Sequence, residues 1–181
     1  MLLAAGGTAA YLVTQHPAAR PAAPLPTRVV SSQTVGLVSQ HAGSAGSQLA
    51  QLLSRDGGAQ FSTLTPALAA AGTPQWTADL MAGNTYIFIY LPSGSCLSAT
   101  GPARRPQLTL ERCDLAAGQR WRRVTTAVLA RGHDFDQYAN LGDGRCLTQA
   151  GPAGDQQYAA TLTTCSAARP ASQLIAFWWG S

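Results

Sequence analysis

Residues 92–121 read PSGSCLSATGPARRPQLTLERCDLAAGQRW, and much of this pattern returns from residue 143 as DGRCLTQAGPAGDQQYAATLTTC. Each copy contains Cys-Leu, then Ser or Thr, two further residues and Gly-Pro-Ala. Each copy then reaches Thr-Leu-x-x-Cys, and a glutamine follows the second cysteine. The unit is about 50 residues long. A repeat of this length indicates an architecture built from similar supersecondary units.

All four cysteines lie in the two copies, Cys96 and Cys113 in the first and Cys146 and Cys165 in the second. Paired within a copy, each pair would close a loop of fewer than twenty residues. Such a bridge contributes roughly 3 kcal/mol to the stability of a small domain. Because disulfides form in oxidising compartments, this pairing predicts an exported protein. The three histidines lack metal-ligand spacing and no C-x-x-C is present, so neither a metal nor another cofactor is expected.

The N-terminal segment is consistent with export. Residues 1–13, MLLAAGGTAAYLV, are uncharged and apolar, too short to span a bilayer but as long as the h-region of a signal peptide. The basic n-region of a signal is missing, which leaves a start further upstream, a weak signal or anchor, and a buried helix as alternatives. We expect an extracellular protein, secreted or tethered to the outer face of the cytoplasmic membrane.

Residues 14–40 are interpreted as a spacer followed by an extended arm. Four prolines in residues 16–26 favour polyproline II or a flexible linker. Residues 27–40, TRVVSSQTVGLVSQ, are rich in β-branched residues and are either the first strand of the globular domain or an arm that pairs with a partner's sheet edge. The arm hypothesis assigns partner contacts to Thr27, Arg28, Val29, Val30, Val35, Leu37 and Val38.

The globular domain is then expected to cover residues 41–181, with clear repeats at 85–124 and 133–179. Residues 47–55 place three leucines on one helical face after a serine N-cap, which predicts a short helix. Residues 61–76 are either a decayed repeat without cysteines or an alanine-rich helix. Strands are predicted at 86–91, 107–112, 128–139 and 174–179. The domain is therefore expected to be all-β.

The order Gly-x-Cys-Leu, a short loop, an alternating strand ending in Cys, and Gln-Arg-Trp resembles the repeat of ricin-type β-trefoil lectins. The motif glutamine and tryptophan of the first copy are Gln119 and Trp121, whereas the second copy has Gln173 without the tryptophan. The resemblance covers roughly residues 85–179. It implies a β-trefoil-like domain, and because a trefoil needs three repeats, a third must come from the region before Trp76 or be absent.

The resemblance does not extend to the family's sugar pockets, which usually combine an aspartate after Cys-Leu, an aromatic residue two positions before the second cysteine and an asparagine beside the glutamine. In the two copies these positions hold Ser98 and Thr148, Glu111 and Thr163, and Gly118 and Ser172. Neither copy therefore has the carboxylate or the stacking ring at the position where the family has it. A protein-binding or structural module is the expectation.

Residues for catalysis or nucleic-acid binding were not found. The net charge of +4 is spread along the chain, and no basic run interleaves with aromatic residues. No Gly-x-Ser-x-Gly elbow or phosphate loop occurs. His133 and Asp134 with nearby Asp136 form the only local histidine–carboxylate cluster, but no nucleophile accompanies it, and a solvated loop is the expectation. The chain is not expected to be an enzyme.

The leading hypothesis is an exported, non-catalytic adaptor that binds one or more secreted proteins in a multi-subunit assembly. In layout and composition the chain resembles small adaptors of secreted actinobacterial complexes such as the umbrella-shaped toxin particles of streptomycetes. The alternative is a lectin that binds cell-surface glycans through a rearranged site at Asp114, Asp143 or Tyr158. A third hypothesis is an inhibitor arm that inserts Thr27, Arg28 and Val29 into a protease cleft.

Overall fold

The computed structural model describes residues 28–40, 49–63, 75–102, 106–124, 128–130, 132–154 and 157–178. These residues form strands and two short 3-10 turns, and none of their helices is long and apolar enough to cross a membrane. The elements are β1 (Val29–Ser39), β2 (Ala50–Arg55), β3 (Gly58–Thr63), β4 (Trp76–Met81), β5 (Thr85–Tyr90), β6 (Ser95–Thr100), β7 (Gln107–Glu111), η1 (Ala117–Gln119), β8 (Trp121–Arg123), β9 (Val128–Ala130), β10 (His133–Asp136), β11 (Tyr138–Asn140), β12 (Cys146–Gly154), β13 (Gln157–Thr163), η2 (Ala171–Gln173) and β14 (Ile175–Trp178).

The centre of the fold is a closed antiparallel barrel. The pairings run β1–β4, β4–β5, β5–β8, β8–β11, β10–β14 and β14–β1, so the sheet returns to its first strand. β10 and β11 are separated only by Gln137 and together occupy one position in the barrel. Closure leaves no long unpaired edge within the barrel.

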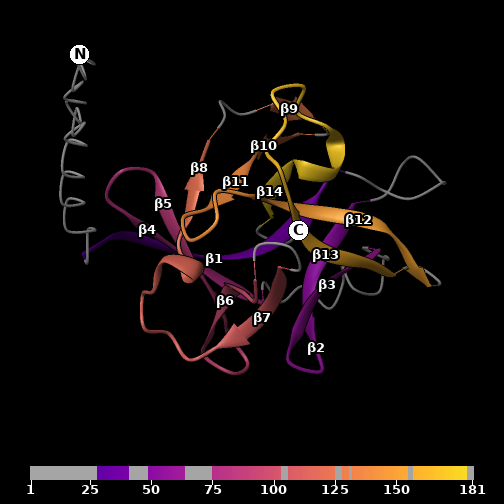
Figure 1. Cartoon of the computed structure of the whole chain (residues 1–181). Coiled ribbons are helices and arrows are strands. Elements are labelled where there is room, and N and C mark those ends of the chain that lie inside the picture. The colour runs from indigo at the N-terminus through magenta and orange to yellow at the C-terminus, as the bar shows by residue number, and fades with distance from the viewer. Residues whose placement is uncertain are drawn as a thin grey trace, which may run out of the picture.

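Three hairpins, β2–β3, β6–β7 and β12–β13, cover one end of the barrel (Figure 1). β3 also pairs with β7 and with β13, which joins the hairpins into one cap. Each hairpin contributes a fully buried leucine that faces an apolar residue on the second strand. The pairs are Leu52 with Phe61, Leu97 with Leu110, and Leu147 with Leu162. The opposite end of the barrel has no such cap among the described residues.

Several hydrogen bonds recur at equivalent positions of the three repeats. The indole of Trp76 donates to the carbonyl of Leu52 at 2.8 Å, and the indole of Trp121 donates to the carbonyl of Leu97 at 3.1 Å, in both cases across 24 positions. The third position holds Ile175, which is fully buried. Three matching backbone bonds link successive repeats, from Gln40 to Leu174, from Leu91 to Gln75 and from Leu141 to Arg120. The fold is a β-trefoil. Its first repeat, β1 to β4, lacks cysteines. The second repeat, β5 to β8, contains Cys96 and Cys113, and the third repeat, β10 to β14, contains Cys146 and Cys165.

Several sequence predictions are confirmed at the level of elements. Residues 86–91, 107–112 and 174–179 correspond to β5, β7 and β14, and region 128–139 contains β9, β10 and most of β11. The predicted helix at 47–55 is wrong, because Ala50–Arg55 is strand β2. Over so short a run the leucines fit the period of a helix as well as that of a strand. The segment is a strand because it pairs with β3.

The predicted boundary between an arm and the domain at residue 40 is also wrong. β1 pairs with β4, β14 and β2, and Val35, Leu37 and Val38 are fully buried in the core, so these three residues cannot contact a partner. The physical reason is barrel closure, which needs an apolar first strand. The predictions for residues 1–13, for the spacer and for Thr27 concern segments outside the described residues.

Candidate binding sites

Both predicted disulfides are present. Cys96 bonds to Cys113 with an S–S distance of 1.99 Å, and Cys146 bonds to Cys165 at 2.05 Å. Each bridge ties the start of the first hairpin strand to the residues that follow the second strand. Disulfides at matching positions of two repeats fit an extracellular or secreted protein.

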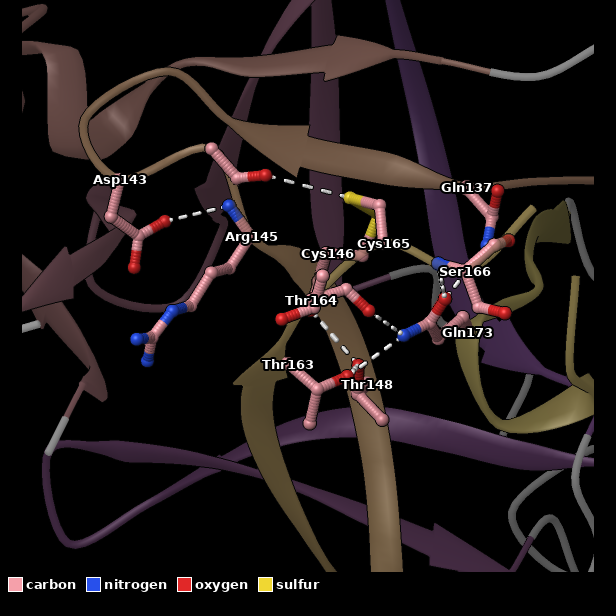
Figure 2. Close-up of a disulfide and its surroundings, with 11 residues drawn as sticks. Gln137, Asp143, Arg145, Cys146, Thr148, Thr163, Thr164, Cys165, Ser166 and Gln173 are labelled. Atoms are coloured by element: carbon pink, nitrogen blue, oxygen red, sulfur yellow. Dashed lines mark hydrogen bonds between the residues drawn. A yellow bond between two sulfur atoms is a disulfide. The ribbon is translucent and has the colours of Figure 1, made fainter. Parts of the chain in front are cut away.

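The motif glutamines hold the segment that follows each second cysteine. The side-chain oxygen of Gln119 accepts bonds from the amides of Asp114 and Leu115 at 3.0 and 3.1 Å, and its nitrogen donates to the carbonyl of Arg112 at 2.8 Å. Gln173 makes the equivalent bonds to Ser166 and Thr164 at 3.0 and 2.8 Å (Figure 2). Both glutamines are buried, so their amides serve the fold.

The sugar-pocket positions of the third repeat are occupied by two threonines that bond to each other. Thr148 donates to the carbonyl of Cys146 at 2.9 Å, and the hydroxyls of Thr148 and Thr163 are 2.8 Å apart (Figure 2). The side chain of Gln173 donates to Thr163 at 2.8 Å. Since each hydroxyl has one proton, the bonds run in one direction, from Gln173 through Thr163 and Thr148 to the backbone. These two positions therefore provide neither a carboxylate nor an aromatic ring that could bind a sugar.

The corresponding positions of the second repeat are Ser98, Glu111 and Gly118, of which Glu111 is exposed. Ser98 is buried, and Gly118 stands so near the neighbouring strand that a Cβ on it would lie 2.6 Å from the carbonyl oxygen of Ala99. An asparagine therefore cannot occupy position 118 without a shift. Glu111 is exposed at the end of β7, where it accepts a bond of 3.4 Å from Thr109.

A pocket of about 260 Å³ lies beside these positions, between β6 and the turn after β11. Its polar groups are engaged in the turn, since the amide of Asn140 donates to the carbonyl of Gly118 at 2.7 Å and Asp143 accepts from the amide of Arg145 at 2.9 Å. The rearranged sugar site was predicted to use Asp114, Asp143 or Tyr158. Of these three residues Asp143 lines this pocket, and Tyr158 belongs to the core.

A second pocket, of about 390 Å³, lies at the uncapped end of the barrel. We call it the barrel-end pocket, and its lining residues are Gln33, Tyr86, Arg123, Leu129, Gly132, His133, Asp134, Asp136, Tyr138 and Phe177. Asp136 is 4% exposed, and one of its carboxylate oxygens lies 3.6 Å from the Arg123 guanidinium. The other oxygen, Oδ1, has no hydrogen-bond partner.

Burial controls the electrostatics of this pocket. Burial raises the pKa of Asp136, the Arg123 guanidinium opposes that rise, and the charge of Asp134 adds to it. Burial likewise raises the pKa of Tyr86, and it raises the pKa of Tyr138 well above the ordinary value. Asp136 is thus a buried carboxyl group beside the pocket, and one of its oxygens lacks a hydrogen-bond donor.

The histidine–carboxylate cluster singled out in the sequence lies in this pocket. His133, Asp134 and Asp136 belong to strand β10 and not to a solvated loop, which corrects that expectation. The partner Arg123 and the ring of Tyr86 were not anticipated. Arg123 comes from β8, and only the barrel register places it beside β10 and β11.

The first half of β1 differs from its second half. Residues 28–34 are exposed, whereas residues 35–39 are buried. Val29 pairs with Met81 and Ser31 with Leu80, so a bulge leaves Val30 without a partner in the ladder. Val29 is 45% exposed and Val30 65% exposed. Figure 1 shows this indigo segment running outward alongside β4.

Comparisons with known proteins support the fold. No family model and no curated protein matches the sequence. Among solved structures, the designed threefold-symmetric protein ThreeFoil is 16% identical with a TM-score of 0.58, over 80% of this chain and 96% of its own. A lectin from Polyporus squamosus, solved with a sialylated epitope, is 14% identical with a TM-score of 0.55, over 80% and 49% of the two chains.

A chain of the cytolethal distending toxin from Haemophilus ducreyi is 16% identical with a TM-score of 0.52, over 80% of this chain and 82% of its own. At these identities the likeness concerns the fold and not the ligand. The chain is a β-trefoil, the fold that is also found in this lectin and in a component of this toxin.

Proposed function

We propose that the chain is an exported, non-catalytic adaptor that binds another secreted protein through the exposed start of β1 and the neighbouring strand ends. The observation that carries this proposal is the exposed start of β1, where Val29 and Val30 are 45% and 65% exposed beside β4. Val124 and Leu129 are further exposed large hydrophobic side chains of the described residues. Exposed apolar side chains that lie next to one another, as Val29 and Val30 do, favour a protein contact.

The residues found at the usual sugar-binding positions of the fold support this proposal. In the third repeat these positions are filled by threonines bonded to one another, and in the second repeat Gly118 lies against a backbone carbonyl. A module that had kept the fold for glycans at these positions would need a carboxylate there. The same scaffold can present a protein-binding surface, because function depends on residues placed on a fold and not on the fold itself.

The test compares two substitutions of an exposed apolar residue by aspartate. Val30→Asp alters the proposed surface, and Leu91→Asp is the matched control in the turn toward the β6–β7 hairpin. The tagged chain is incubated with the secreted proteins of its host, and stoichiometric partners are identified by mass spectrometry. We expect one or two secreted proteins to be retained by the wild type and by Leu91→Asp, and about 10-fold weaker capture by Val30→Asp.

The proposal fails if the wild type retains no secreted protein or if Val30→Asp captures as well as the control. A multi-subunit assembly, of the type seen in secreted antibacterial toxin particles, would elute with this chain at a constant ratio in size-exclusion chromatography. Elution of the chain with a single partner would limit the proposal to a binary complex.

The second candidate function is glycan binding at a position other than the usual ones. The observation that favours it is the barrel-end pocket, whose lining includes polar side chains, among them Asp134, Arg123 and Gln33.

A further inference from the structure

The edge of β1 that pairs with β14 continues beyond the end of β14. Pairing with β14 stops at Gly36, which lies opposite Trp178. On its other edge β1 pairs with β4 as far as Val29. Residues 29–35 therefore have a strand on one side, and the described part of the chain places no strand on the other side.

The hydrogen bonds of β14 identify the backbone groups that face this open edge. Successive residues of an antiparallel strand direct their N–H and C=O groups to opposite edges. The amide of Gln40 donates to the carbonyl of Leu174 at 3.0 Å, in register with the β1–β14 pairs. Even-numbered residues of β1 therefore face the edge of β14. By the same alternation Thr34 and Ser32 face this edge where β14 has ended.

The pairing of β4 with β5 gives the same result independently. The amide of Leu91 donates to the carbonyl of Gln75 at 2.8 Å, in register with the β4–β5 pairs, so Trp76 directs its backbone groups to β1. The partner of Trp76 in β1 is Val35, and odd-numbered residues of this segment therefore bond to β4. The even-numbered residues are left with backbone donors and acceptors at an open edge.

The open edge has few of the features by which proteins keep other chains from pairing with a sheet edge, such as charged residues and proline. Residues 29–35 read VVSSQTV, with neither a charge nor a proline, and residues 28–34 are exposed. The bulge at Val30 is a protective feature, but it lies before Ser32. An exposed, uncharged segment rich in β-branched residues favours pairing with a further strand.

A strand at this edge would lie beside the barrel-end pocket. Opposite residues of an antiparallel pair place their side chains on the same face of the sheet. Gln33 lines the pocket, together with Phe177 of β14. A residue of the added strand opposite Gln33 therefore directs its side chain toward the pocket, and the lining can distinguish one segment from another.

We propose that the secreted partner adds an extended segment of its own as a strand at the open edge of β1, antiparallel to β1 and in line with β14. Its backbone bonds to Ser32 and Thr34, and its residue opposite Gln33 contacts the barrel-end pocket. In such complexes main-chain hydrogen bonds supply affinity and the alternate side chains supply specificity. This inference rests on the proposed function, because it specifies how the exposed start of β1 holds the partner.

The first test removes one backbone donor from the open edge. Thr34→Pro deletes the amide proton that faces this edge, and it leaves the bonds to β4 in place because odd-numbered residues make them. Thr34→Ala keeps the amide and is the matched control. Circular dichroism verifies that both variants are folded. In capture of secreted host proteins, we expect the wild type and Thr34→Ala to retain the partner and Thr34→Pro to retain it at least about 10-fold more weakly.

The second test observes the bonds directly and needs no variant. Hydrogen exchange of the isotope-labelled chain is followed by NMR, with the secreted protein eluted from the wild-type chain as the probe. In the free chain the amides of Ser32 and Thr34 should exchange faster than those of Gln33 and Val35, which face β4. In the complex the amides of Ser32 and Thr34 should exchange at least about 10-fold more slowly than in the free chain.

Strand addition is overturned if folded Thr34→Pro captures as well as Thr34→Ala, or if the amides of Ser32 and Thr34 exchange equally fast in the free chain and in the complex. It is also overturned if these amides are already protected in the free monomer. Protection that rises with the concentration of the free chain, with a dimer seen by light scattering, would assign the edge to a second copy and overturn it too. Absence of any retained protein refutes the proposed function and this inference with it, whereas the other outcomes refute only strand addition.

Discussion

Replacement of Asp136 by valine should stabilise the protein at neutral pH, although most core substitutions destabilise. The wild-type carboxylate is 4% exposed and leaves Oδ1 without a donor, a cost of about 1–3 kcal/mol. Valine removes that cost and adds buried apolar surface. The change leaves Arg123 without its carboxylate, but the Arg123 side chain is 38% exposed, so water replaces a contact of 3.6 Å at little cost.

We therefore expect Asp136→Val to raise the free energy of unfolding by about 1–3 kcal/mol at pH 7. For a domain of this size the gain corresponds to an increase of roughly 3–10 °C in Tm. Thermal unfolding followed by circular dichroism measures it, with Asp143→Asn as the control, because asparagine keeps the oxygen that accepts from the Arg145 amide.

The pH dependence of this gain has a definite sign. Burial raises the pKa of Asp136 above its ordinary value of 3.8, so between these two pKa values the native state holds a proton that the unfolded state has released. The contribution of Asp136 to stability is fully present below the ordinary pKa and is lost as pH rises through the raised value. The variant keeps the other titratable and charged side chains that line the same pocket. These are Asp134, His133, Arg123, Tyr86 and Tyr138.

The advantage of Asp136→Val over the wild type should therefore grow from pH 3 to pH 7. Unfolding curves at intervals across this range, with Asp136→Asn as a second variant that lacks the titrating group, provide the measurement. A lower Tm for Asp136→Val at pH 7 would refute the argument that Oδ1 is unsatisfied. An advantage that shrinks as pH rises would refute the assigned direction of the pKa.

Three further predictions concern the repeats. Replacing Cys146 and Cys165 by serine should lower the free energy of unfolding by about 3 kcal/mol in urea titrations. An unchanged midpoint would show that the disulfide does not reduce the conformational entropy of the unfolded chain. Thr148→Val breaks the hydroxyl chain and should cost about 1–2 kcal/mol by the same assay, whereas Thr148→Ser should cost less because it keeps the hydroxyl. Gly118→Ala should cost about 1–3 kcal/mol because its Cβ would lie 2.6 Å from a backbone carbonyl oxygen, and Gly151→Ala, with no atom within 4 Å, should be near neutral in thermal unfolding.

The repeats could be predicted from the sequence because their signals are local. Cys96 and Cys113 are 17 positions apart and Cys146 and Cys165 are 19 apart, so each disulfide lies within one hairpin and its flanks. Gln119 and Trp121 follow the same hairpin directly. The apolar run before the first copy and the run at the C-terminus were likewise sufficient to predict β5 and β14.

The first repeat could not be settled in this way, because its signal is spread over long distances. Trp76 donates to the carbonyl of Leu52 as Trp121 donates to that of Leu97, but no cysteine marks the pair in the sequence. The leucines of β2 match a helical period as well as a strand. Whether residues 27–40 formed an arm or a strand depended on β4 and β14, whose pairing with β1 the local sequence does not encode.

Residue identity and short spacing were enough to predict an all-β chain with two disulfide-closed repeats that lack the usual sugar-binding groups. Barrel closure by β1, and the contact between Arg123 and Asp136 at the uncapped end, became visible in the folded structure. These contacts join residues from different repeats, and their burial depends on the register of a closed sheet. A side chain's partner and its access to water are properties of that register, so the barrel-end pocket appears only once the barrel is formed.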